Sequence, residues 1–370
     1  MNRSLDEANF SDFIRESFDA LPWDPEPDSD FSILSLFHLA KEHCERRGIY
    51  VGAIDIDDLN AVAFEHKGSE CIGITRGTIE QLHHALGLVA SCMKEPFFDA
   101  EQPWDDEKRL DATRFRKGRQ DELHLSNGQR ALWQALMDVS VVFILHHELG
   151  HLESGHIYWL QQGLRKNRAA LFERPLDHKS NAELLGVDAD NITALEVDAD
   201  TDAVTATLEL LDGISYTSDR EGNLWLNLLE NNDTRYPIVD IAFNIVFVLF
   251  SHQTASVESY HGSHPHPDIR GAYCNAGALV YCSQPNQEEA LQAYRRWRTS
   301  PHLSNFYWEM HYVLKGPYHL QDYLANAKSL SGKINKVTQE LWEHSKPIWN
   351  NVAEYADERR KKRDSARERK

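Results

Sequence analysis

The apolar residues of this 370-residue chain recur mostly with a helical period, so the pattern predicts a largely helical protein. Phe31–Cys44 is amphipathic, and the apolar run Val141–Leu145 is typical of a buried helix. A longer apolar segment, Pro237–Phe250, is expected to form a core helix. Helices are predicted to dominate from Gln129 onwards. One of these helices is marked by Ala290, Leu291, Ala293, Tyr294 and Trp297.

A strand pattern is clearest in one part of the chain. Asn60–Glu65 and Cys71–Thr75 are each predicted to form a strand, joined by a turn at Lys67, Gly68 and Ser69. A helix over Thr78–Met93 is expected to follow. The predicted fold class is therefore α+β, mainly helical with a small β-sheet.

The chain is expected to have three parts. Residues 1–45 form a helical lead-in, residues 46–275 form the main domain, and residues 276–370 form a helical C-terminal extension with a basic tail. Two charged insertions interrupt the main domain, at about residues 96–127 and 160–190. Insertions of this length are commonly lids, substrate selectors or partner surfaces.

Charge and cysteine content narrow the class of protein. The net charge of −19 disfavours nucleic acid as a partner, because phosphates would be repelled. The exception is the basic tail Arg359–Lys370, which is either a solvated helix end or a tether for an acidic partner or nucleic acid. The five cysteines lack CxxC spacing, which favours reduced thiols over a disulfide framework.

The sequence predicts no membrane span. Pro237–Phe250 is shorter than the roughly 20 apolar residues that a bilayer requires, and Asp240 and Asn244 interrupt it. The N-terminal segment Met1–Phe13 is polar and acidic, without an apolar signal region. A cytoplasmic protein is therefore expected.

An HExxH motif is the strongest chemical signal in the chain. His147 and His151 are four residues apart, so on a helix their imidazoles share one face and can bind one metal ion. Glu148 lies beside them and can take a proton from a metal-bound water. The alternative is a helix with two surface histidines, because the motif also arises by chance.

A third ligand is predicted on a second helix. Glu196 and Asp200 are four residues apart in a segment predicted to be helical, so Glu196 can ligate the metal while Asp200 hydrogen-bonds a ligand histidine. Asp198 and Asp202 are rivals for the ligand role, although they lie on other helix faces. The remaining alternative is an acidic, solvated helix face.

Two further segments are candidates for contacts with substrate. An extended peptide can add to the edge of the predicted strand pair by main-chain hydrogen bonds, whereas the alternative is a hairpin that only covers the core. The substrate-binding residues predicted there are Ala61, Ala63, Ile72 and Ile74. Ser263–Arg270 is predicted to be a rigid, proline-containing turn. A histidine or arginine fixed there, His264 or Arg270, can face the open side of the metal and stabilise an oxyanion.

These motifs, in this order, resemble those of the HtpX and CAAX-prenyl-endopeptidase family of gluzincins. The matching segments are Asn60–Ala63, Ile72–Gly77, His147–His156, Glu196–Asp200 and His264–Arg270. The resemblance implies a zincin-type metallopeptidase fold with its small sheet beside the active-site helix. It implies one Zn²⁺ per chain, held by His147, His151 and Glu196, with Glu148 as general base, Asp200 as the outer hydrogen-bonding carboxylate, and His264 and Arg270 near the cleft.

Two other families share part of the pattern. The ExxA[DN] element also occurs in ImmA/IrrE-type peptidases, and the zinc helix is similar to that of the phage-exclusion protease Lit. Unlike the usual gluzincin pattern, this chain has about seventy residues between Gly77 and His147. Many relatives are integral membrane proteins, whereas this chain lacks a predicted span.

The function expected from the sequence is zinc-dependent endoproteolysis of a protein or peptide substrate. The alternative is a latent or non-catalytic zinc-binding regulatory protein, controlled by a partner, in stress or phage defence. A purely structural zinc site would require a fourth protein ligand. His156 is the candidate, but it is expected to point away from the face that carries His147 and His151.

Overall fold

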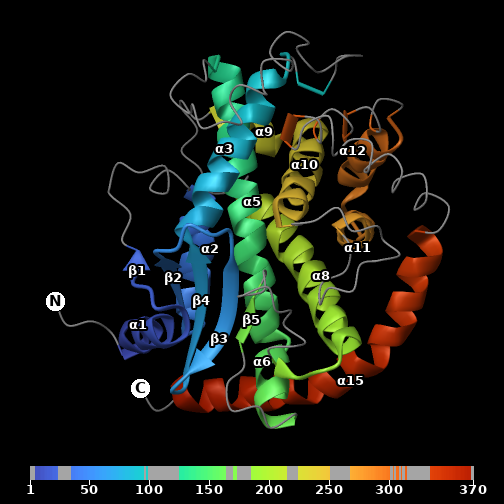
Figure 1. Cartoon of the computed structure of the whole chain (residues 1–370). Helices are drawn as coiled ribbons and strands as arrows, with labels where there is room; N and C mark the ends of the chain where they lie inside the picture. Colours follow the sequence, from blue (N-terminus) through green and yellow to red (C-terminus); the bar gives the residue numbers. More distant parts are fainter. Residues whose placement is uncertain are drawn as a thin grey trace.

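The computed structural model describes residues 5–23, 35–95, 97–98, 125–163, 170–172, 185–214, 224–250, 267–300, 303, 306–307, 310, 313–314 and 334–367. Its helices form the larger part of the fold and run along the chain as α1 Leu5–Phe18, α2 Ser35–Arg46, α3 Arg76–Cys92, α5 Asn127–Glu153, α6 His156–Tyr158, η3 Trp159–Gly163, α8 Ala189–Ile214, α9 Leu224–Glu230, α10 Asn232–Phe250, α11 Pro267–Cys282, α12 Glu288–Arg298 and α15 Ile334–Arg367 (Figure 1). The strands are β1 Pro22–Trp23, β2 Ile49–Ile54, β3 Ala61–His66, β4 Ser69–Thr75 and β5 Ala170–Phe172. The predicted α+β class is confirmed.

The sheet is mixed and has the strand order β1-β2-β4-β3-β5. β3 and β4 form the predicted antiparallel hairpin, while β2 runs parallel to β4. Lys67 and Gly68 both have positive φ, 52° and 83°, as expected for the two central residues of a tight hairpin turn. The strands β1, β2 and β5 were not predicted individually, because they are short or pair with distant segments.

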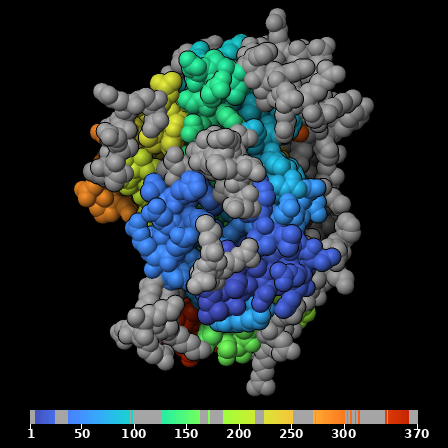
Figure 2. All heavy atoms as spheres, turned by 90° about the vertical axis from the view of Figure 1, so that its left-hand side faces the viewer, coloured from blue at the N-terminus to red at the C-terminus, as the bar shows by residue number. Residues whose placement is uncertain are grey.

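Alternate strand residues face opposite layers, as the two-residue period of a strand requires. On one face, Val62 and Phe64 of β3 pack against Phe10 and Phe13 of α1. On the other face, the strands join the main core, which includes residues of α2, α3 and α5. The sheet therefore lies between α1 and the helical layer (Figure 1). Figure 2 turns this side towards the viewer, with the blue N-terminal elements in the middle of the face.

The longest buried helix is α5, which runs through the middle of the molecule (Figure 1). A capping box fixes its start: the Ser126 hydroxyl accepts from the Gln129 amide, and the Gln129 side chain accepts from the Ser126 amide. Phe143 packs against Phe243 and Phe247 of α10, with ring centroids 4.2 and 5.6 Å apart. These contacts hold the following turns of α5 in place.

The apolar segment Pro237–Phe250 lies within α10 and is largely buried in the core, as predicted. Among the parts of the chain described above, no helix combines the length and the apolar character needed to span a bilayer.

The C-terminal helix α15 packs against α8, α6 and α11 and curves around the lower edge of the molecule (Figure 1). The Trp349 indole N–H donates to the carbonyl of Ala194 in α8 at 2.8 Å. Arg359, the first residue of the basic tail, forms an ion pair with Glu70 of β4. The predicted C-terminal helix thus continues through most of the basic tail, and its first basic residue is tied to the sheet rather than solvated.

Candidate metal centre

His147 and His151 lie on the last turns of α5 and face the same side, as their spacing predicts. Both are buried, with 2% and 1% of their surface exposed, and their Nε2 atoms are 3.1 Å apart. The preceding apolar run, Val141–Leu145, is also buried, which removes the alternative of two surface histidines.

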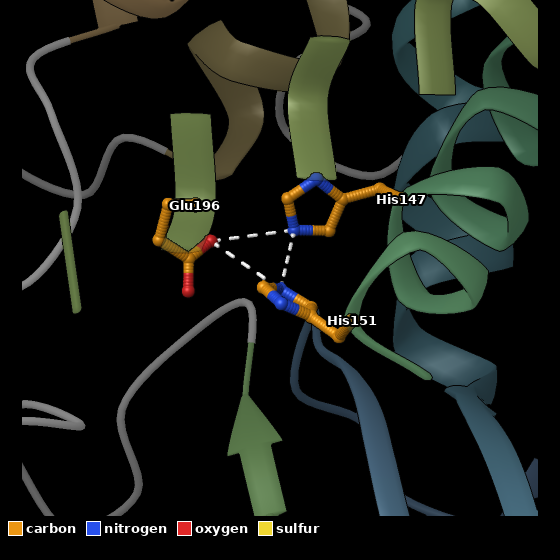
Figure 3. A group of neighbouring side chains, drawn as sticks. All are labelled: His147, His151 and Glu196. Carbon is orange, nitrogen blue, oxygen red and sulfur yellow. Dashed lines mark hydrogen bonds and ion pairs between the residues drawn. The ribbon is translucent and has the colours of Figure 1, made fainter. Parts of the chain in front are cut away.

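Glu196 reaches the two histidines from α8, the neighbouring helix (Figure 3). Its Oε2 atom lies 3.3 Å from His147 Nε2 and 3.8 Å from His151 Nε2. Small residues allow the two helices to approach closely, since a Cβ at Gly150 would lie 3.1 Å from Ala199 Cα. Glu196 is fully buried, so the alternative of a solvated acidic helix face is wrong at this position.

These three residues, the ligand triad, can hold a metal ion because their donor atoms all lie within 4.8 Å of one another. Two imidazole nitrogens and a carboxylate oxygen are a donor set typical of zinc. Burial lowers the pKa of His151 to about 4, so its imidazole is neutral near pH 7 and offers a lone pair. A buried carboxylate is costly without a compensating charge, which a divalent cation supplies. The residues therefore fit a metal.

A carboxylate on α8 contacts the Nδ1 side of the His147 ring and orients it. Its Nδ1 atom lies 2.9 Å from Asp200 Oδ1, which leaves Nε2 directed towards the triad. Asp200 in turn accepts two hydrogen bonds from the Arg270 guanidinium, from Nε at 2.8 Å and from Nη2 at 2.7 Å. Asp200 thus makes the contact with a histidine of the triad that the sequence predicts for it.

Arg270 of α11 is buried beside the site, with its guanidinium carbon 4.7 Å from the centre of the Phe247 ring. Its guanidinium group donates two hydrogen bonds to Asp200, which lies at the Nδ1 side of His147, away from His151 and Glu196. It thereby balances the charge of that carboxylate. His264, the other residue predicted near the cleft, lies outside the described residues.

His151 is held by a second arrangement that the sequence interpretation missed. His156 Nδ1 lies 2.9 Å from His151 Nδ1, and His156 Nε2 lies 3.0 Å from Asp198 Oδ2. The prediction that His156 points away from the metal-binding residues was wrong, because it assumed a continuous helix. α5 ends at Glu153, and Gly155, with φ of 81°, turns the chain back towards His151.

The two acidic rivals of Glu196 have other partners. Asp198 contacts His156, and Asp202 accepts a hydrogen bond from the Ser154 hydroxyl at 2.6 Å. Within the described ranges, the group of potential ligands contains neither of them, nor His156. His156 is therefore not placed as the fourth ligand that a structural zinc site needs.

Glu148 follows His147 directly on α5 and is fully buried. It is not part of the ligand triad. His146, which precedes His147 on α5, faces α8, where its Nδ1 lies 3.1 Å from the Thr207 hydroxyl. Burial lowers the pKa of His146 to about 3, so this histidine is neutral near pH 7. Of the three histidines on the last turns of α5, His146 therefore packs against α8, whereas His147 and His151 belong to the ligand triad.

β3, at whose edge a substrate peptide was expected to add, is an inner strand of the sheet rather than an edge strand. β5, which belongs to the insertion between α5 and α8, pairs with β3 in antiparallel register from Val62 to Phe64. The side chains predicted to bind substrate are all buried in the main core: Ala61, Ala63, Ile72 and Ile74. The hairpin therefore helps to cover the core, and the free edge expected at β3 is taken by the chain itself at these positions.

Other residues of the shared motifs hold the strand ends together. The Asn60 amide donates to the hydroxyl groups of Thr75 and Thr78, at 3.0 and 2.8 Å. Gly77 lies so close to the loop before β3 that a Cβ there would be 1.9 Å from the Asp57 carbonyl oxygen. These positions are explained by packing at the start of α3.

Comparison of the chain with protein-family models, with curated proteins and with solved structures found no match.

Proposed function

We propose that this protein is a zinc-dependent endopeptidase of the gluzincin type, with one Zn²⁺ held by His147, His151 and Glu196. The observation that carries the proposal is the buried ligand triad, whose donor atoms lie within 4.8 Å of one another. A catalytic zinc site has three protein ligands and keeps one position open, whereas a structural site closes all four. Among the described residues, no fourth histidine, cysteine or carboxylate joins the triad.

The chemistry follows from this ligand set and its neighbours. Zinc in such a site polarises a carbonyl oxygen and lowers the pKa of water towards neutrality. Glu148, adjacent to His147 on α5, serves as general base for the attacking water and then passes the proton to the leaving amine. Asp200 and Arg270 keep His147 in the tautomer whose Nε2 carries the lone pair. The order of the motifs along the chain, which resembles the HtpX and CAAX-prenyl-endopeptidase family, supports peptide bonds as the substrate.

The proposal is tested by measuring zinc content and peptide cleavage on the same preparations. Wild-type protein should bind one zinc per chain and cleave members of a diverse peptide library, and a chelator should abolish cleavage. Glu148→Gln should keep zinc and lose cleavage by at least about 100-fold, the usual contribution of a general base. Glu153→Gln, at the end of the same helix, is the matched control and should retain both properties. Absence of stoichiometric zinc, or full activity of Glu148→Gln, contradicts the assignment.

A second candidate function is a latent peptidase, and the position of β5 favours it. A peptide that adds to a strand needs that strand's main-chain groups, and β5 already pairs with them at Val62, Ala63 and Phe64. β5 comes from the long insertion, so the chain itself occupies the edge at which a substrate strand was expected. A partner that removes β5 would then expose that edge.

Leu171 lies opposite Ala63 and offers a direct test of latency. Leu171 is completely buried in the main core, so Leu171→Asp would bury an unpaired charge there and should detach β5. Leu171→Val keeps an apolar side chain and suits a strand, and is the control. If the protein is latent, Leu171→Asp should cleave peptides faster than wild type at equal zinc content, whereas Leu171→Val should not. Equal rates in all three proteins would exclude latency through β5.

A further inference from the structure

The contacts of His156 determine which of its nitrogens carries a proton. Asp198 Oδ2 lies 3.0 Å from His156 Nε2, and a carboxylate accepts hydrogen bonds, so Nε2 carries a hydrogen. The Nδ1 atoms of His156 and His151 are 2.9 Å apart, so one of the two must donate and the other accept. His156 is completely buried, so bulk water does not compete for either contact.

Only one assignment of these hydrogens is compatible with a metal on His151. If His156 accepts at Nδ1, then His151 donates from Nδ1, and its Nε2 carries the lone pair that faces His147 and Glu196. If His156 donates instead, a neutral His151 has its hydrogen on Nε2, where it blocks a metal. In the first assignment the lone pair of His151 Nε2, which lies 3.8 Å from Glu196 Oε2, can bind the same ion as that carboxylate.

The α8 helix supplies matching carboxylates to both metal-binding histidines. Asp200 contacts His147 Nδ1 directly, and Asp198 reaches His151 through His156. The chain turns at Gly155, with φ of 81°, shortly after α5 ends at Glu153. That turn places His156 between the last turn of α5 and α8.

We propose that His156 and Asp198 are positioning residues, a relay that holds His151 in its metal-binding tautomer. The proposal rests on a metal at the ligand triad, as in the proposed function. The Asp198 side chain is 29% exposed while His156 is fully buried, so the relay runs from the protein surface to the triad. Carboxylate and imidazole groups behind a ligand histidine raise its basicity and fix its orientation.

The test measures zinc affinity by competition with a chelator, together with the visible absorption spectrum of the Co²⁺-loaded protein. His156→Phe keeps a ring of similar shape and removes the acceptor for His151. It should weaken zinc binding by about 10- to 100-fold, the usual effect of losing such a partner, and change the Co²⁺ spectrum. His156→Gln retains an acceptor oxygen and should recover part of the affinity.

Asp198 provides a second pair of variants at a partly exposed site, where substitution is less disruptive to folding. Asp198→Asn still presents an oxygen to His156 Nε2 and should bind zinc more tightly than Asp198→Leu, which presents none. Asp202→Asn is the matched control, because Asp202 lies one turn further along α8 and bonds Ser154 instead. Its zinc affinity should equal that of wild type.

The outcomes separate the relay from the proposed function. If wild-type protein binds no metal, the function proposed above fails. If wild type binds zinc and cleaves peptides, but His156→Phe and Asp198→Leu match its affinity and Co²⁺ spectrum, the relay alone is overturned. Unfolding of the metal-free variants in urea identifies any that have lost the fold, and the Asp198 pair then decides the result.

Discussion

The buried ion pair between Arg270 and Asp200 makes Arg270→Met a stringent test of the site's electrostatics. Methionine fills much of the volume of the arginine stem but leaves the Asp200 carboxylate, which is completely buried, without its counter-ion. Two hydrogen bonds, at 2.8 and 2.7 Å, are lost at once. His147 Nδ1 remains as a contact at 2.9 Å and offsets part of the loss.

The expected magnitude follows from this geometry. Removing one partner of a buried ion pair destabilises a fold by about 3–5 kcal/mol. Because His147 still contacts Asp200, we expect the lower end, about 3 kcal/mol, which is a large share of the roughly 5–15 kcal/mol of a typical domain. Urea unfolding of the metal-free protein measures this change directly.

Two comparisons make the result decisive. Arg296→Met removes an arginine from an exposed pair with Asp233, whose side chains are 60% and 59% accessible, and should cost at most about 1 kcal/mol. Arg270→Met combined with Asp200→Asn removes both charges and should recover part of the stability lost by the single change. The argument fails if Arg270→Met is no more destabilising than Arg296→Met.

Three other changes are expected to alter stability in opposite directions. Gly155→Ala should lower the free energy of unfolding by about 1–3 kcal/mol in urea titrations, because Gly155 has φ of 81° and a Cβ would lie 2.6 Å from the Ala356 amide nitrogen. Gly213→Ala, in α8 with nothing within 4 Å of the added Cβ, should instead stabilise the protein by about 0.5–1 kcal/mol, and a loss would contradict its helical environment. Zinc at 1,000 times its dissociation constant should stabilise wild type and Glu148→Gln by about 4 kcal/mol, measured by thermal unfolding, but leave Glu196→Gln unchanged. An equal gain in Glu196→Gln would remove Glu196 from the triad.

The parts of the protein that were predicted from the sequence are those encoded over short distances. The helix that carries His147 and His151 follows from an apolar run and a spacing of four residues, and both features act within a few turns. The β3–β4 hairpin likewise follows from two apolar segments around a turn at Lys67 and Gly68. The choice of Glu196 over Asp198 also came from helix geometry, since residues four apart share a face and Glu196 shares one with Asp200.

The features that escaped prediction depend on where distant segments meet. β5 consists of three residues, and its pairing with β3 joins distant parts of the chain, which so short a pattern does not reveal. The direction of His156 depends on one residue, Gly155, which has a left-handed conformation. The prediction for His156 assumed that the helix continues through this position. Arg270 was expected near the cleft, but its pairing with Asp200 becomes visible only once α11 is packed against α8.

The difference between the features that were predicted and those that were not has a physical cause. The geometry of a helix or a hairpin is set by neighbours in the chain, so apolar period and turn residues are enough to identify the two histidines and their helix. The orientation of a buried imidazole depends on which hydrogen-bond partners packing brings to its far nitrogen. For His147 and His151 those partners are Asp200 and His156, and their roles emerge from the contact of α5 and α6 with α8.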